Sequence, residues 1–398
     1  MEIIGIIILA LTLVAFLTLK IGDIFSPWNI TTVIWLAILV MFQFQGDLLY
    51  PLGNQFFGCL MLWVPLFCIS SLITFYVLPD RSDAKKTSSI PEINHTIFTV
   101  LYVISMVITP LYLYEIMKTV MQFDTSDMLY NLRLLAVHGD ESHGFLNYSY
   151  VLNQVLLVVA LWQYPKVPMW QLITIILASI MSAFAIMEKG MVFFLFAAIL
   201  FTLYEKRVIK MRSIIISGIS IIILFFFFNM ARDYREDADP NDAMTFLDFF
   251  AIYVLSPAVA FERVQEDLTP QFGSHTFQTI YLFLNRFGGD YEVNTKLQEF
   301  VWVPLPTNVY TVFQPFFEDF RYKGVAIFAM FYGVCSGFCY RLMLNGNGIA
   351  KCLYVYVVYV LALQFFQENV MLSIVTIIQF VFFVTIIQQQ KIHFSFSR

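Results

Sequence analysis

Residues 56–78 read FFGCLMLWVPLFCISSLITFYVL, a stretch without a charged side chain. An α-helix needs about 20 mostly apolar residues to cross the hydrocarbon of a bilayer, so this stretch predicts a transmembrane helix. Ten further apolar runs predict the same element, and together they predict an all-α, polytopic integral membrane protein with about 11 transmembrane helices. The other runs lie near residues 3–19, 29–45, 96–116, 148–162, 169–187, 191–204, 213–229, 323–340, 350–366 and 369–388.

The composition of the 398-residue chain indicates the same class. Hydrophobic residues make up 59% of it and charged residues only 13%, and the mean hydropathy is +0.75. Soluble domains are about a quarter charged, so this chain cannot cover a water-facing surface and we expect the lipid bilayer to surround it. The formal net charge of −5 gives no reason to expect a nucleic-acid partner.

Lys and Arg in short loops predict the orientation, because such loops stay on the cytoplasmic side. Under alternation of the spans the basic clusters fall on one side, which places the N-terminus outside and the C-terminus inside. We therefore expect one transmembrane domain, 1–398, with an outer loop at 117–147 and a large periplasmic loop at 230–322, between the eighth and ninth spans. The clusters are Arg81/Lys85/Lys86, Lys206/Arg207/Lys210/Arg212, Arg341/Lys351 and Lys391/Arg398.

The segment 230–322 is too apolar for a linker, and residues 244–254 and 276–287 predict short interfacial helices in it. It contains five of the chain's eleven Arg but only one of its twelve Lys. Because a guanidinium grips phosphate with two parallel donors, this bias predicts a local phosphate site. The alternative is that these Arg pair with the fourteen Asp and Glu of the same segment. The candidates are Arg232, Arg235, Arg286, Arg263 and Arg321.

Lys189 is a further candidate cation, because it lies between two apolar runs, where an ionisable group is expensive. The alternative is a plain hairpin whose Glu188 and Lys189 reach water. The step Asp237-Ala238-Asp239 could hold a divalent ion, but it lacks the glycine and distal Glu of a calcium loop. A solvated turn explains it better, so we expect neither a metal nor a cofactor.

The stretch 306–320, PTNVYTVFQPFFEDF, mixes polar and aromatic side chains just before a predicted span. Asn, carboxylates and aromatic faces are groups that bind sugars, whereas composition alone indicates an aromatic belt at the membrane surface. Here the chain resembles the O-antigen polymerases, the Wzy-type oligosaccharide repeat-unit polymerases of bacteria. Residues 307–311 (TNVYT) and 316–320 (FFEDF) are similar to the family's Asn-Val-Tyr-Thr…Asp-Phe-Gly pattern, and Arg321 replaces its last glycine, which leaves the local turn open.

The plan of the chain is similar to that family as well, with many spans and a large periplasmic loop before the last three. Residues 255–261 and 272–277 resemble weaker family features, and residues 188–190 stand where related proteins have a turn with a cation. Related O-antigen ligases place a His before the Asn of a similar motif. Thr307 stands there in this chain, so that role does not transfer.

The resemblance implies glycosyl transfer on the periplasmic face of the bacterial inner membrane. Its substrates would be undecaprenyl-pyrophosphate-linked oligosaccharides, and its partners could include a chain-length regulator protein. Asn308, Tyr310 and Thr311 would bind sugar, and the Arg set with Lys189 would bind pyrophosphate. An acceptor hydroxyl also needs a base, for which the candidates are Asp319 and Glu318, with His275 behind them.

Other functions stay open on the sequence. A flippase-like transporter of lipid-linked oligosaccharide would show inverted repeats and charges near the midplane, whereas here the charges gather in one outer loop. A ligase-like transferase or a non-catalytic assembly scaffold would have the same composition. A metal-dependent transferase would want an acidic pair in its first outer loop, where this chain has only Asp47.

Overall fold

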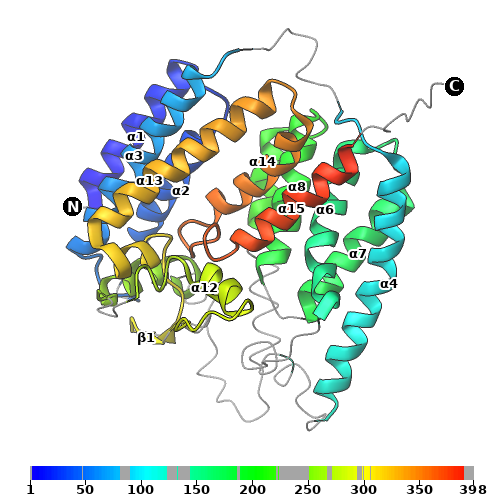
Figure 1. Ribbon diagram of the computed structural model, residues 1–398. Helices are drawn as coiled ribbons and strands as arrows, with labels where there is room; N and C mark the ends of the chain where they lie inside the picture. The colour runs from blue at the N-terminus through cyan, green and yellow to red at the C-terminus, as the bar shows by residue number, and fades with distance from the viewer. Residues whose placement is uncertain are drawn as a thin grey trace, which may run out of the picture. The chain divides into compact units, whose positions relative to one another are not determined.

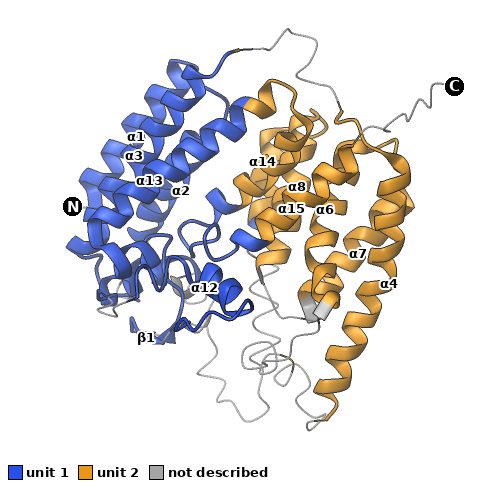
Figure 2. Cartoon of the chain, in the orientation of Figure 1, with its two compact units in different colours: residues 1–79, 219–341, 360–375 blue, residues 80–218, 342–359, 376–398 orange. Residues whose placement is uncertain are grey.

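The computed structural model describes residues 2–46, 48–80, 90–122, 132, 144–185, 189–220, 223, 251–266, 271–293, 298, 300–304 and 306–389. The chain divides into two compact units, each assembled from three segments (Figure 2). Unit 1 comprises residues 1–79, 219–341 and 360–375, and unit 2 comprises residues 80–218, 342–359 and 376–398. The single transmembrane domain stays a prediction.

The membrane elements are helices, as the hydropathy predicts. Within the described residues, four helices are long and apolar enough to cross a membrane, and seven shorter apolar helices accompany them. The number of about 11 spans therefore stays a prediction. The long helices are α3 (Asn54–Val77), α4 (His95–Val120), Phe145–Gln163 and α13 (Gln314–Leu344). The shorter ones are α1 (Glu2–Thr18), α2 (Pro27–Phe42), α7 (Met169–Ala185), α8 (Lys189–Glu205), Met211–Ser220, α14 (Gly348–Ala362) and α15 (Ile374–Gln388).

Unit 2 is organised around α6 (Tyr148–Gln163), which follows the short 3₁₀ helix η2 (Gly144–Asn147). The helix is buried from Val151 to Gln163 and contacts α4, α7 and α8, as expected of a mostly apolar helix. Asn153 links three of these helices. Its side chain accepts a hydrogen bond from Ser105 of α4 and donates to Ser182 of α7, at 2.5 and 3.1 Å. Such bonds join helices where water is absent.

Unit 1 contains a close approach between α3 and α13. Gly333 and Gly337 lie four residues apart on α13, and a Cβ atom on either would come within 2.4 Å of a backbone carbonyl of α3, that of Phe67 or Ser71. Small residues at this spacing let membrane helices touch through their backbones. The α3 and α13 backbones are therefore closely packed at these glycines.

Three segments of unit 1 lie at one end of it, near the start of α3: residues 261–264, the residues before α13, and the connector 363–373. The Gln55 side chain at the start of α3 donates to the carbonyls of Phe261 and Val264, at 2.8 and 3.0 Å. The 363–373 connector contacts the same region through a bond from Val312 N to Gln364 O of 2.9 Å. The alternation predicted from the basic loops also puts these segments on one side, and their outward orientation stays a prediction. In Figure 1, α12 and β1 lie at this end, beside the start of α13.

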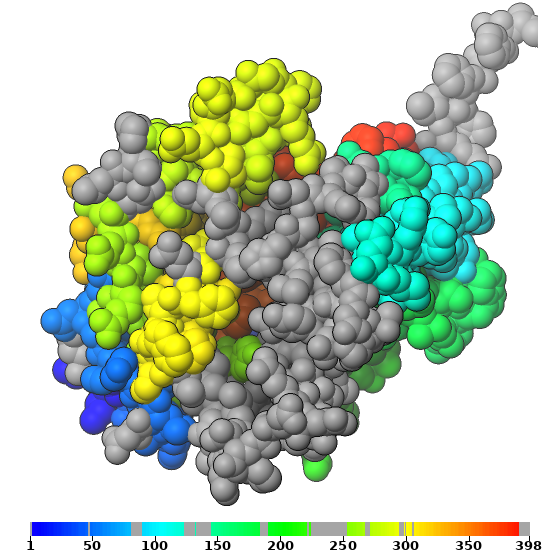
Figure 3. Space-filling view, turned by 90° about the horizontal axis from the view of Figure 1, so that it is seen from below, coloured from blue at the N-terminus to red at the C-terminus, as the bar shows by residue number. Residues whose placement is uncertain are grey.

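The described part of 230–322 is a string of short elements. A π-helical turn η4 (Ala251–Leu255) leads into α11 (Ser256–Ala260) and the 3₁₀ helix η5 (Phe261–Arg263). Helix α12 (Gln278–Asn285) confirms the helix predicted at 276–287, while residues 244–250 lie outside the description. Strands β1 (Val301–Trp302) and β2 (Pro306–Thr307) pair antiparallel, with Val301 opposite Thr307. In the space-filling view these elements form the yellow-green and yellow surface of unit 1 (Figure 3).

Candidate functional site

His275 and Glu318, which are 43 positions apart in sequence, form a pair in unit 1. His275 Nδ1 lies 3.1 Å from Glu318 Oε2, and the two side chains are 18% and 14% exposed. Glu318 is held from the other side by Gln314, whose amide donates to its Oε1 at 3.3 Å. The same amide donates to Gln298 at 2.8 Å. Gln314 thus holds Glu318 Oε1, while Oε2 faces His275 in a contact without hydrogen-bond geometry, and both side chains still reach the surface in part.

Asp319, the neighbouring carboxylate, has a different environment. It accepts hydrogen bonds from the backbone N–H groups of His275 and Thr276, at 3.2 and 2.7 Å, and from the Ser274 hydroxyl at 3.3 Å. Gly273 permits the turn with a φ of 63°. Asp319 thus ties the 273–276 turn, which contains His275, to α13.

The motif aromatics form a core and not the aromatic belt that composition indicates. Phe313, Phe316 and Phe317 are at most 1% exposed. Phe313 stacks on Trp35 of α2 with ring centroids 4.9 Å apart, and Phe316 stacks on Phe328 at 4.2 Å. The belt interpretation is wrong for these three, because all are buried in the protein. Phe313 and Phe316 also contact Trp63 of α3, and Phe317 contacts Phe261.

The predicted sugar ligands differ in their access to the surface. Thr311 is fully buried and Tyr310 is 6% exposed, whereas Asn308 is partly exposed. The Thr311 hydroxyl accepts a hydrogen bond from the N–H of Phe313 at 3.4 Å. In this structure Asn308 is the one of the three that a sugar reaches most readily.

The candidate cations fall into three groups. Arg232 and Arg235 lie outside the described residues, and the Lys189 side chain is not described, although its backbone begins α8. Arg286 is exposed at the C-terminal end of α12. Arg263 and Arg321 line the same pocket in unit 1.

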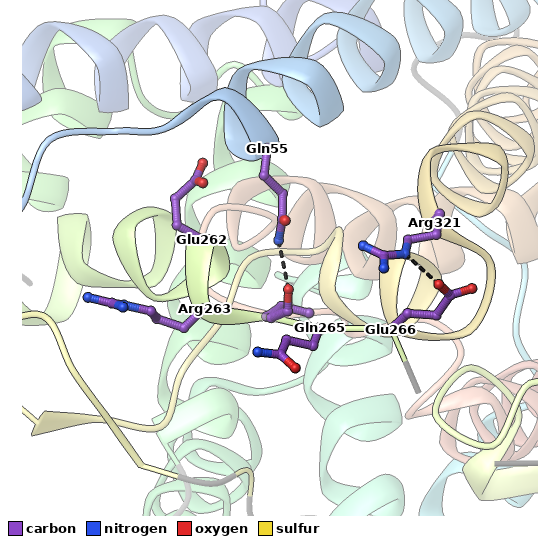
Figure 4. Close-up of a pocket in the computed structure, with 7 residues that line it drawn as sticks. Gln55, Glu262, Arg263, Gln265, Glu266 and Arg321 are labelled. Atoms are coloured by element: carbon purple, nitrogen blue, oxygen red, sulfur yellow. Dashed lines mark hydrogen bonds and ion pairs between the residues drawn. The ribbon is translucent and has the colours of Figure 1, made fainter. Parts of the chain in front are cut away.

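This pocket has a volume of about 450 Å³. Its floor is the segment that follows η5, and Arg321 borders it from α13 (Figure 4). Arg321 Nε lies 2.8 Å from Glu266 Oε2, and its guanidinium lies over the Phe317 ring at 5.3 Å. Arg263 lies over the Tyr50 ring at 5.8 Å. The complete lining among the described residues is Gln55, Glu262, Arg263, Val264, Gln265, Glu266 and Arg321.

The backbone of Arg321 shows whether the local turn forms without the glycine of the family pattern. It has a φ of 55° and a ψ of −148° and divides α13 into two helical parts. Glycine adopts this conformation freely, whereas another residue loses about 1–3 kcal/mol. The turn that a glycine would favour is therefore present in this chain, with an arginine at its centre.

Glu368 is a residue that the sequence analysis missed. It is 2% exposed, in the connector between α14 and α15, and accepts hydrogen bonds from the Tyr332 hydroxyl at 2.6 Å and from the N–H groups of Val370, Met371 and Leu372 at 2.6, 3.0 and 2.9 Å. Burial raises the pKa of this carboxyl group, and the hydrogen bonds lower it. A signal was present, because Glu368 is the one acidic residue after Asp319 and lies between two apolar runs.

The 363–373 connector, which Glu368 stabilises, contacts the 306–320 segment. The Gln364 side chain accepts a hydrogen bond from Trp63 Nε1 at 3.1 Å, and its carbonyl accepts from Val312. The carbonyl of Leu372 accepts from the Thr279 hydroxyl of α12 at 2.8 Å. The connector therefore links α3, the motif and α12.

Metal ligands do not gather in the described part of the chain. No group of three or more His, Cys, Asp or Glu side chains is placed there to hold an ion. Asp237 and Asp239 lie outside it. The expectation of a metal-free site stays a prediction.

Comparison with known proteins gives one similarity over nearly the whole chain. The sequence is 25% identical over 382 residues to an Escherichia coli (strain K12) protein named "Putative O-antigen polymerase", covering 92% of both chains. No family model matches the sequence, and no solved structure matches the chain. The chain is thus an α-helical membrane protein whose sequence is similar throughout to a protein with that name.

Proposed function

We propose that this chain joins lipid-linked oligosaccharide repeat units into O-antigen or a similar surface polysaccharide. The reaction is glycosyl transfer at the periplasmic face of the bacterial inner membrane, and the substrates are linked to undecaprenyl pyrophosphate. The similarity to the E. coli protein supports a role in O-antigen polymerisation. The observation that carries the chemistry is the His275–Glu318 pair, at the end of unit 1 where the predicted outer segments meet.

The pair brings together a candidate general base and a carboxylate that can orient it, with 3.1 Å between His275 Nδ1 and Glu318 Oε2. In the proposed reaction the ring turns so that Nδ1–H donates to Glu318, and the His275 ring then presents an unprotonated Nε2 that can accept a proton. The acceptor hydroxyl transfers its proton to Nε2, while its oxygen forms a bond to the anomeric carbon of the donor sugar. The bond from that carbon to the pyrophosphate oxygen breaks, and undecaprenyl pyrophosphate leaves with both electrons. No metal or cofactor takes part in this proposal.

The departing pyrophosphate needs positive charge near the bond that breaks. We assign this role to Arg232, Arg235, Arg286 and Lys189. Arg263 and Arg321 form a separate set, because the pocket that they border also contains Glu262 and Glu266. Asp319 serves in this scheme as the residue that positions His275, and Asn308 contacts sugar.

The test uses the full-length chain in a strain from which its own gene is deleted. The proposal expects single-repeat lipopolysaccharide in the deletion strain and a ladder of lengths after complementation. His275→Ala is expected to lower the polymerisation rate by about 10²–10⁴-fold, the usual contribution of a general base. Glu318→Gln acts in the same direction, since it removes the negative charge that stabilises the protonated His275 ring. His95→Ala, at the exposed start of α4, is the matched control and should leave the ladder unchanged.

Other outcomes identify the alternatives. A transporter predicts that deletion removes even single-repeat lipopolysaccharide from the cell surface. A ligase-like transferase predicts polymer that stays on the lipid carrier. If His275→Ala and Glu318→Gln both accumulate and build normal ladders, the pair is not the base. Asp319→Asn is then the next variant to examine.

A further inference from the structure

Arg321 has a backbone conformation that side chains rarely adopt. Its φ of 55° and ψ of −148° interrupt α13, and in this region the Cβ atom crowds the backbone. Helix α13 continues immediately afterwards, so the interruption is local. A residue other than glycine at position 321 therefore carries backbone strain. An arginine at this position is a candidate for a functional contact.

The conformation places the guanidinium at the edge of the pocket. Arg321 is fixed by Glu266 on one side and by the Phe317 ring on the other, at 2.8 and 5.3 Å. Figure 4 shows Arg321 and Gln55 directed toward the same space, while the Arg263 side chain extends away from them. Two contacts that hold a long side chain in place lower the entropy lost when it binds a ligand.

The charges around the pocket indicate which ligand it takes. Two Arg and two Glu side chains line it, together with Gln55 and Gln265. Glu266 is already paired with Arg321 and would repel a pyrophosphate group that approached the same guanidinium. A sugar ring carries no such charge, and its hydroxyl groups can accept from guanidinium and donate to carboxylate or amide oxygens. The volume of about 450 Å³ is within the range of small-molecule sites.

We infer that Arg321 contacts a sugar unit of the lipid-linked substrate in this pocket, and that the pocket contributes to the selection of the repeat unit. The inference rests on the proposed function and deepens it. It assigns Arg321 to sugar and leaves the pyrophosphate to the other cations. It also gives a role to an arginine in a conformation that suits glycine.

Arg321→Gly is the decisive variant, because the loss of backbone strain should preserve or raise stability, whereas the loss of the guanidinium should lower polymerisation. Removal of the strained side chain is expected to keep the thermal unfolding midpoint of the detergent-solubilised protein at or above that of the wild type. Polymerisation in the deletion strain is expected to fall at least tenfold, with loss of the longer chains. Glu266→Gln, which frees the guanidinium, should lower polymerisation less. Lys323→Ala, at an exposed position two residues away, should behave like the wild type in both assays.

Binding is tested on purified full-length protein with two probes. The first is the single-repeat oligosaccharide released from the strain's own lipopolysaccharide, which should raise the thermal midpoint of the wild type and not of Arg321→Gly. The second is inorganic pyrophosphate, and a midpoint shift that depends on Arg321 for this probe only would overturn the sugar assignment. A normal ladder in Arg321→Gly would also overturn it, as would a loss of folded protein. If the wild-type chain fails to restore a ladder, the proposed function fails instead.

Discussion

Glu368 offers the sharpest test of how the candidate site is held in place. Its carboxylate accepts four hydrogen bonds, three at Oε1 and one at Oε2. Alanine would leave two buried donors without an acceptor, the Tyr332 hydroxyl and the N–H of Met371, at about 1–3 kcal/mol each. The total of about 2–6 kcal/mol is a large part of the stability of a typical protein, about 5–15 kcal/mol. We therefore expect Glu368→Ala to accumulate poorly in membranes.

Glutamine at position 368 keeps the shape of the side chain and removes its charge. Its amide oxygen can take the place of Oε1 and keep three of the four bonds, but its NH₂ group then faces the N–H of Leu372. The expected cost is one unsatisfied donor, about 1–3 kcal/mol. Glu368→Gln should accumulate, with a lower thermal midpoint and shorter polymer, since the connector supports the motif and α12.

The assay combines the amount of full-length protein in membranes, the thermal midpoint in detergent and the polysaccharide ladder. Lys323→Ala is the control, because Lys323 lies at an exposed position outside the connector. If Glu368→Ala accumulates with a wild-type midpoint, the four hydrogen bonds do not stabilise the connector and the argument fails.

Three further predictions concern the helices, the metal and the topology. Gly337→Ala should lower the thermal midpoint, because its Cβ would lie 2.4 Å from the Ser71 carbonyl oxygen, whereas Gly218→Ala meets nothing within 4 Å and should not. A chelator should leave polymerisation by purified protein intact, and restoration of lost activity by magnesium or manganese would contradict this. A reporter fused after Asn241 should give a periplasmic signal, and a cytoplasmic signal would overturn the predicted topology.

Hydropathy predicts most of the membrane helices because an apolar helix must match the thickness of the bilayer, whatever its neighbours are. The prediction of a span near 323–340 agrees with the part of α13 after Arg321, which ends at Leu344. Packing is different, because it depends on shape as well as polarity. Phe313 and Phe316 have the composition of a membrane-surface belt and the position of a core, and only their stacking on Trp35 and Phe328 distinguishes the two.

The candidate site was harder to predict, because the contacts that make it are distant in sequence. Arg263 and Arg321 were recognised as an Arg-for-Lys bias, but no pattern indicates that they border one pocket with Glu262 and Glu266. Asn308 and Thr311 belong to one short motif, yet Thr311 is fully buried. A motif identifies a segment, and the fold decides which of its side chains reach the surface.

The two adjacent carboxylates show this most clearly. Neighbouring residues on a helix project in directions about 100° apart, so the Glu318 and Asp319 carboxylates meet different groups. One direction meets the backbone N–H groups of His275 and Thr276, and the other meets the His275 ring. The sequence offers both carboxylates as a base with equal reason, because it contains no information on what each direction meets. Once the 273–276 turn is in place, Asp319 is occupied by backbone donors and Glu318 is left to orient the histidine. Exchange of the two residues should therefore abolish the pair, although it changes neither the charge nor the composition of the motif.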